Sequence, residues 1–156
     1  MHSLTTCLWF DNEAEEAANF YCNVIKDSEI TSVFRNPEAS RGEEGTILTV
    51  NLTIKGINFM LLNGGPHYKL SPAVSFMLFC DTQEEIDFYW DTFAEGGEEM
   101  MCGWITDKFG VSWQLVPAVY NEMIKAPEKG NVNKMFEALL GMKKLDISQL
   151  VEAYNS

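Results

Sequence analysis

The sequence predicts an α+β protein built from two βαβββ modules, followed by a helical extension at the C-terminus. Three observations support this prediction. Both halves of the chain read as a strand, a helix and further strands, their helical residues match at a constant spacing, and short helical segments follow Pro117. Such internal similarity is typical of a duplicated structural unit. The length of 156 residues suits one domain with a modest appendage.

The first half begins with a β-rich run at residues 4–10, which ends at Asp11. A helix then begins with acidic residues in its first turn, where they interact favourably with the helix dipole. Its apolar residues recur every three or four positions and predict one buried face, formed by Ala14, Ala17, Ala18, Tyr21, Val24 and Ile25. Strands are predicted at 30–35, 46–54 and 57–62, and Lys55-Gly56 joins the last two as a hairpin.

The second half repeats this order. Residues 74–80 are a predicted strand, and Asp81-Thr82-Gln83-Glu84 has the pattern of a helix capping box. The helix stops at Gly96-Gly97, and strands are predicted at about 99–106 and 111–116, joined by the turn 107–110. The helices correspond at an offset of 69 residues, with Ala17, Phe20, Tyr21 and Val24 matching Ile86, Tyr89, Trp90 and Phe93.

The extension covers residues 117–156 and is predicted to be helical. Its helices are expected at 118–125, 132–140 and 147–154, separated by Pro127, Gly130 and Gly141. The last begins at another capping box, Asp146-Ile147-Ser148-Gln149. Helices this short are marginal on their own. We therefore expect them to dock on the paired domain (1–116, with modules at about 1–65 and 72–116) or on a second subunit.

Charge and hydropathy exclude several classes of partner. The chain has 23 acidic and 11 basic residues, a formal net charge of −12. Nucleic acid and anionic membranes attract basic surfaces, so neither is an expected partner. No apolar run approaches the ~20 residues that span a bilayer. The first six residues lack the basic and apolar regions of a secretory signal, so we expect a cytoplasmic protein.

The cysteines are predicted to be free, buried thiols. Cys7, Cys22, Cys80 and Cys102 include no Cys-x-x-Cys pair, and His2 and His67 are the only imidazoles, which is a poor supply for a zinc site. The acidic neighbours Glu98 and Glu99 disfavour a thiolate, and therefore a nucleophile, at position 102.

Several motifs together resemble the PhnB-like branch of the glyoxalase/bleomycin-resistance/dioxygenase (vicinal-oxygen-chelate) superfamily. They are Leu8-Trp9-Phe10-Asp11 with the helix 14–21, Leu62-Asn63-Gly64-Gly65-Pro66, Cys102-Gly103-Trp104, the segment 107–114 and the closing segment 142–147. The resemblance covers nearly the whole chain, and proteins of this branch often carry the label 3-demethylubiquinone-9 3-methyltransferase. It implies an eight-stranded, cupped, mostly antiparallel sheet around a cavity. It also implies a homodimer whose modules pair within or between chains.

The resemblance also indicates where a metal would bind. Metal-binding relatives take one His or Glu from the first and last strand of each module. These positions fall on Thr6, on Phe59 or Met60, on Ser75 and on Gln114. Catalytic divalent cations need three or four converging donors, usually including carboxylate or imidazole. We therefore expect no catalytic metal and no other cofactor.

The same positions predict a cavity lining. Side chains alternate along a strand, so residues two apart share a face. The expected lining is apolar with a few neutral polar groups: Thr6, Leu8, Phe10, Phe59, Ser75, Met77, Phe79, Trp104, Ser112, Gln114 and Val116. It favours a flat or oily small molecule, and the alternative is a filled core. Trp9 and Trp113 have the parity of the helix-covered face.

Two further features leave alternatives open. The segment Asn63–Pro66 is interpreted as a turn that leaves a strand, with anion binding by its backbone amides as the alternative. His67 beside it is interpreted as an exposed loop residue, with a general base as the alternative.

Three functions agree with this pattern. The leading hypothesis is a protein that binds a small apolar or aromatic molecule without a metal. The second is an enzyme that uses Gln114, Ser75 and Thr6 as neutral polarising groups around a carbonyl or quinone-like substrate. The third is a regulator that acts through its C-terminal helices. Methyl transfer is disfavoured, because Asp11-Asn12-Glu13 follows the first strand without the glycine-rich turn of Rossmann-like methyltransferases.

Overall fold

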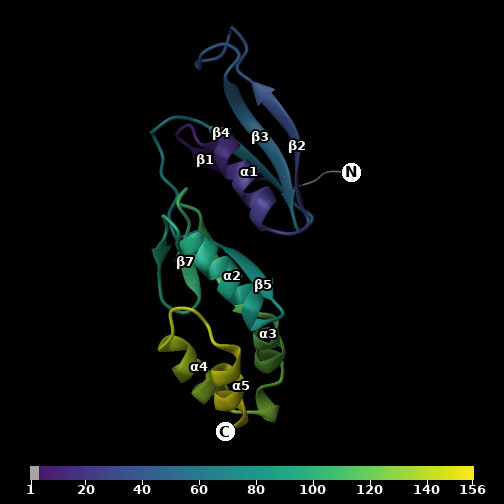
Figure 1. The fold of residues 1–156 in the computed structure, drawn as a ribbon, viewed down its shortest axis with the longest axis vertical. Helices are drawn as coiled ribbons and strands as arrows, with labels where there is room; N and C mark the ends of the chain where they lie inside the picture. Colours follow the sequence, from purple (N-terminus) through teal and green to yellow (C-terminus); the bar gives the residue numbers. More distant parts are fainter. Residues whose placement is uncertain (1–3) are drawn as a thin grey trace. The chain divides into compact units, whose positions relative to one another are not determined.

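In the computed structural model, which describes residues 4–156, the chain forms two units that divide at Leu70 and Ser71 (Figure 1). The first contains β1 (Thr6–Phe10), α1 (Ala14–Val24), β2 (Ser28–Arg35), β3 (Ile47–Ile54) and β4 (Ile57–Asn63). The second begins with β5 (Phe76–Cys80), α2 (Gln83–Ala94), β6 (Glu98–Glu99), β7 (Trp104–Thr106) and β8 (Ser112–Pro117). The predicted α+β class and the duplicated βαβββ order are confirmed.

Each unit has its own four-stranded mixed sheet. The strand orders are β1-β4-β3-β2 and β5-β8-β7-β6. The first strand of each module runs parallel to its last strand, and the other neighbours are antiparallel. The described strands therefore form two open sheets of four, in place of the continuous eight-stranded sheet that the resemblance implied.

In the first unit, α1 covers one face of the sheet. Small residues line the contact side of this helix and allow close approach, since Ala14, Ala17 and Ala18 are fully buried. The sheet residues of that face are also buried: Leu8, Phe10, Val50, Leu52, Ile54, Phe59 and Leu61. The β3–β4 hairpin turns at Lys55 and Gly56, whose φ values of 48° and 79° are those of a tight primed turn.

In the second unit, α2 packs through aromatic side chains. Its Phe93 stacks on Trp113 of β8 with ring centroids 5.2 Å apart, and Phe76 of β5 lies 5.7 Å from the same indole. The helix is capped one residue later than predicted. Thr82 Oγ1 accepts from the Glu85 amide, and the Glu85 carboxylate accepts from the Asp81 amide.

The predicted strand at 99–106 is wrong, because a turn divides it into β6 and β7. Cys102 and Gly103 adopt positive φ values of 62° and 80° in this turn. Both of their amides donate to backbone carbonyls of the extension, Cys102 to Met142 and Gly103 to Lys143, each at 2.7 Å. The extension thus accepts hydrogen bonds from two backbone amides that would pair within the sheet if the strand were continuous.

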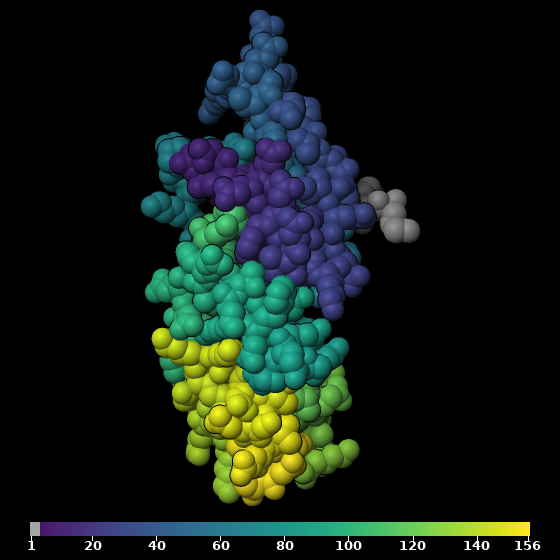
Figure 2. Space-filling view, in the orientation of Figure 1, coloured from purple at the N-terminus to yellow at the C-terminus, as the bar shows by residue number. Residues whose placement is uncertain are grey.

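The extension folds as part of the second unit, where it lies against the teal elements in Figure 2. It consists of α3 (Ala118–Lys125), a 3₁₀ turn η1 (Pro127–Lys129), α4 (Val132–Leu140) and α5 (Ile147–Asn155). These helices share an apolar cluster of Met123, Met135, Leu139, Leu145, Leu150 and Tyr154. Gln83 of α2 also holds the extension, since its amide donates to the Leu145 carbonyl and accepts from the Ile147 amide.

Lys144 of the extension pairs with two carboxylates of α2, Asp87 at 3.0 Å and Asp91 at 3.5 Å. Hydrogen bonds from Lys144 and Gln83 lower the pKa of Asp87. The hydrogen bond to Asp87 raises the pKa of Lys144, against the opposing effect of partial burial. The contribution of Asp87 to stability is therefore present above its unfolded pKa and lost as the pH falls through its lowered folded pKa. That of Lys144 is present below its unfolded pKa and lost as the pH rises through its raised folded pKa.

We expect Asp87→Asn to lower the thermal midpoint slightly at neutral pH, because Asp87 is exposed and Lys144 only partly buried, and such pairs contribute little. The difference from the unmodified chain should disappear as the pH falls below 3.8, the ordinary pKa of the group. Thermal unfolding followed by circular dichroism across this range measures it. Asp91→Asn, with the longer contact, is the matched control. A midpoint difference that persists at lower pH would show that Asp87 acts through something other than its charge.

Within residues 4–156, no helix has both the length and the apolar character of a membrane span.

Candidate functional site

Each sheet has one face under its own helix, and we call the opposite face its open face. In the second unit the open face carries Met77 and Phe79 of β5, which are 48% and 43% exposed. Met77 is the register partner of Gln114 on β8, which is in turn the partner of Trp104 on β7. Alternation along the strands therefore sets these four side chains on one surface.

A hydrogen bond joins two of the neutral polar residues of this surface. Gln114 Nε2 donates to Ser75 Oγ at 2.8 Å. The amide oxygen of Gln114 has no hydrogen bond among the described residues. Ser112 and Val116 have the same parity, but both are buried, and Ser112 Oγ lies 3.5 Å from Thr106 Oγ1. The structure thus groups Ser75, Met77, Phe79, Trp104 and Gln114 and leaves Ser112 and Val116 covered.

The predicted lining of the first unit lies on the wrong face. Leu8, Phe10 and Phe59 are buried beneath α1, and Thr6, the register partner of Phe59, shares their parity. The prediction that Trp9 lies under the helix is also wrong. Trp9 is half-buried on the open face with its register partner Leu62. Trp113, by contrast, does lie under its helix, stacked on Phe93.

The length of one loop explains this error. Three residues join β1 to α1, whereas two join β5 to α2. The helices correspond at an offset of 69 residues, but the first strands correspond at 70, and a shift of one residue exchanges the faces of a strand. The counterpart of Gln114 is therefore Met60, and the counterpart of Ser75 is Thr5. The open face of the first sheet carries Cys7, Trp9, Met60 and Leu62.

The cysteines are free thiols, as predicted, but their burial differs. Cys80 is buried, Cys22 and Cys102 are half-buried, and Cys7 is exposed because it belongs to the open face. Desolvation by neighbouring side chains raises the pKa of the Cys7 thiol, and desolvation together with the nearby charge of Glu29 raises the pKa of Cys22. Protonated thiols are weak nucleophiles and weak metal ligands.

The residues at the positions where the resemblance places metal ligands do not fit a divalent metal. Met60, Ser75, Gln114 and Thr5 or Thr6 carry neither carboxylate nor imidazole. Across residues 4–156, no group of three His, Cys, Asp or Glu side chains is placed to hold a metal ion. His2 lies outside the described residues. No chemical step of this site is therefore derived through a metal.

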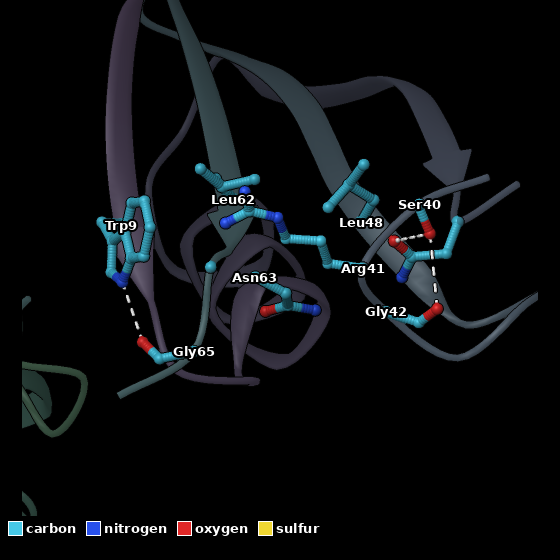
Figure 3. Close-up of a pocket in the computed structure, with 10 residues that line it drawn as sticks. Trp9, Ser40, Arg41, Gly42, Leu48, Leu62, Asn63 and Gly65 are labelled. Carbon is cyan, nitrogen blue, oxygen red and sulfur yellow. Dashed lines mark hydrogen bonds between the residues drawn. The ribbon is translucent and has the colours of Figure 1, made fainter. Parts of the chain in front are cut away.

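A pocket of about 400 Å³ opens beside the open face of the first sheet (Figure 3). Trp9, Leu48 and Leu62 form its apolar wall, and Asn36, Ser40, Arg41, Gly42, Asn63, Gly64 and Gly65 complete it. Trp9 is fixed there, because its Nε1 donates to the Gly65 carbonyl at 2.8 Å and Tyr68 meets its ring edge-on at 5.1 Å. The sequence prediction missed Arg41, whose signal is that it is one of only two arginines in an acidic chain.

The backbone amides of the loop after β4 are not free to bind an anion. Gly64 N donates to the Phe10 carbonyl at 2.9 Å, and Gly65 N donates to the Asp11 carbonyl at 3.1 Å. The alternative of an amide anion site is therefore wrong, since these bonds extend the parallel pairing with β1. His67 is exposed beside Tyr68, with 6.1 Å between ring centroids.

Comparison with known proteins agrees with this fold. Residues 2–116 match the family described as 3-demethylubiquinone-9 3-methyltransferase. The chain is 37% identical to a PhnB protein from Bacillus cereus that carries the same methyltransferase name provisionally, over 75% of this chain and 100% of that one, with a TM-score of 0.68. No curated protein sequence gives a significant match.

Two more distant structures show the same fold. Protein PA1353 from Pseudomonas aeruginosa is 20% identical over 75% of this chain and 98% of its own, with a TM-score of 0.62. The fosfomycin resistance protein FosX from Listeria monocytogenes was solved with Mn(II) and 1S,2S-dihydroxypropylphosphonic acid. It is 11% identical over 80% of this chain and 98% of its own, with a TM-score of 0.56.

Proposed function

The chain belongs to the PhnB-like family described as 3-demethylubiquinone-9 3-methyltransferase, within the vicinal-oxygen-chelate superfamily, and we propose that it binds a small, largely apolar or aromatic molecule without a catalytic metal. The open faces of the two sheets are the candidate binding surfaces for this ligand.

The chemistry of the open faces is the observation that carries this proposal. In the second unit, Met77 and Phe79 expose apolar surface beside the Ser75–Gln114 pair. In the first unit, Trp9 and Leu62 take the corresponding place next to a pocket. None of these side chains is charged. Sites for small molecules combine apolar walls with a few polar groups that fix orientation, and the open face of the second sheet has that composition.

Methyl transfer is not part of the proposal. Methyltransferases of the Rossmann-like type bind their cofactor at a glycine-rich turn after the first strand of a parallel sheet. Here β1 leads through Asp11, Asn12 and Glu13 into α1, and each sheet is mixed and four-stranded. The family name instead suggests a quinone ring as a reasonable probe of the site.

Calorimetric titration of the full chain with a tail-less ubiquinone analogue tests the proposal. We expect saturable binding that does not change after dialysis against a chelator. Native mass spectrometry of the protein purified from its source should show ligand and no stoichiometric metal. A tightly held metal whose removal abolishes binding would overturn the proposal, and so would the absence of any bound apolar molecule in both measurements.

The Gln114→Leu variant tests whether the quinone lies on the second open face. Loss of the amide should weaken quinone binding roughly two- to tenfold, because a neutral hydrogen bond contributes about 0.5–1.5 kcal/mol. Gln149→Leu, the same change at an exposed site of α5, should leave the affinity unchanged. Equal affinities for all three proteins, with no conversion of the quinone by any of them, would exclude this face as the site.

The Ser75–Gln114 pair also supports a second candidate, an enzyme that polarises a carbonyl with neutral groups. A Gln114→Leu variant that keeps its affinity but loses conversion of a quinone would select this alternative.

A further inference from the structure

We propose that the pocket of the first unit binds the oxyanion group of an amphipathic ligand through Arg41, with the apolar or aromatic body of the ligand against Trp9 and Leu62. This inference rests on the proposed function and names a ligand class: a small monoanion, carboxylate or phosphonate, on an aromatic or aliphatic body. Every residue that forms the pocket belongs to the first unit.

The other polar side chains of the pocket are engaged in holding the loop between β2 and β3 and the start of α1. Asn36 donates to Thr46 Oγ1 at 3.0 Å and accepts from Ser40 Oγ at 3.0 Å. Asn63 accepts from the Ala14 amide at 2.9 Å and donates to the Ile47 carbonyl at 3.1 Å. These groups shape the pocket, and their polar atoms are already paired.

Arg41 differs from them. In Figure 3 its side chain extends across the pocket toward Leu62, between Leu48 and Trp9. Within the part of the chain that the structure describes, its guanidinium has neither a carboxylate within salt-bridge distance nor a hydrogen-bond acceptor. Arg35, the other arginine, already donates to the Gly45 carbonyl at 2.9 Å. A guanidinium presents a fork of donors that matches the geometry of carboxylate and phosphonate oxygens.

The size and wall of the pocket select the rest of the ligand. A volume of about 400 Å³ suits a small organic molecule. Gly64 lies so close to Trp9 that a Cβ at this position would stand 2.3 Å from the indole ring, so the absence of a side chain there is what admits the ring. The indole then offers a flat apolar surface beside a cation, which suits an aromatic or aliphatic body that carries an acid group.

Net charge limits the number of negative groups on the ligand. The chain carries a formal charge of −12, which repels polyanions at long range. One exposed guanidinium beside an apolar wall therefore favours a monoanion over a nucleotide or a polyphosphate. The proposed ligand thus differs in charge from a quinone, which is neutral.

Three probes with one body test the inference on the full chain by calorimetry: naphthalene carboxylate, naphthalene phosphonate and neutral naphthalenemethanol. We expect the better anion to bind at least about tenfold more tightly than the alcohol, because charge-assisted hydrogen bonds are roughly twice as strong as neutral ones. Arg41→Ala should reduce the affinity for that anion to the affinity for the alcohol. Arg41→Lys should keep part of the preference for the anion over the alcohol. The relative affinities of the carboxylate and the phosphonate show which oxyanion fits the pocket better.

The controls separate charge from shape. Lys26→Ala removes one positive charge from an exposed site of the same unit and should leave all affinities unchanged. Gly64→Ala should displace the Trp9 ring and weaken the anion and the alcohol alike. If the alcohol binds as tightly as both anions, or Arg41→Ala leaves anion affinity intact, the anion site is wrong and the proposed function stands. If none of the three binds and the quinone also fails, both are wrong.

Discussion

Replacement of Asp107 by alanine is expected to lower the free energy of unfolding of the second unit by at least about 3 kcal/mol, because each buried donor left without its acceptor costs about 1–3 kcal/mol. The carboxylate is buried and accepts three hydrogen bonds. Oδ1 accepts from the amides of Phe109 at 2.8 Å and Val111 at 3.1 Å, and Oδ2 accepts from Trp113 Nε1 at 2.9 Å. Alanine would leave three donors without their acceptor.

Urea unfolding of the full chain measures this loss. Asp107→Asn should have an intermediate effect, because an amide keeps one acceptor oxygen but turns a donor toward one of the three donors. Asp146→Ala is the matched control: it removes an exposed N-cap of α5, a change that costs about 1 kcal/mol. Equal losses for Asp107→Ala and Asp146→Ala would mean that the turn does not hold Trp113 in place.

The same turn shows what the sequence predicts well. The sequence predicts a turn at residues 107–110. The structure confirms it, with two backbone amides donating hydrogen bonds to the Asp107 carboxylate and a φ of 85° at Gly110. The helices are also close to their predicted bounds. Capping residues and apolar periodicity are local signals, so a single sequence contains them.

The faces of the strands were predicted correctly in one module and incorrectly in the other. A strand as short as β1 carries little periodic signal of its own, and its residues alternate between Leu, Trp and Phe, which are apolar on both faces. The positions that the resemblance implies set the parity at Thr6, which keeps the 69-residue offset of the helices, and one additional residue between β1 and α1 reverses it. Such a length difference becomes visible only when strand pairing is known.

Long-range contacts lie beyond local signals for a similar reason. Arg41 reaches the pocket because the loop after β2 folds back through hydrogen bonds of Asn36 to Thr46 and Ser40. The turn at Cys102 and Gly103 interrupts the predicted strand, because its two amides donate to the carbonyls of Met142 and Lys143. No sequence motif indicates either set of hydrogen bonds, because each joins residues that meet only in the folded chain.

Leu150→Ala is expected to destabilise the second unit by about 2–5 kcal/mol, the range for removing a buried leucine side chain. Leu150 is fully buried in the cluster of the extension, at 0% exposure. Leu140→Ala is the matched control, because the same change at a side chain that is 60% exposed should stay within about 0.5 kcal/mol. Urea unfolding gives both values.

The same variant tells whether the extension and the second module unfold together. The extension contains no tryptophan. Circular dichroism reports all helices of the chain, those of the extension among them, and fluorescence reports Trp90, Trp104 and Trp113 once Trp9 of the first unit is replaced by Phe in every protein compared. We expect Leu150→Ala to shift both transitions equally, because Gln83, Cys102 and Gly103 bind the extension through their hydrogen bonds. A helical transition that Leu150→Ala shifts while the fluorescence transition stays unchanged would instead make residues 117–156 a separately unfolding appendage to the family domain.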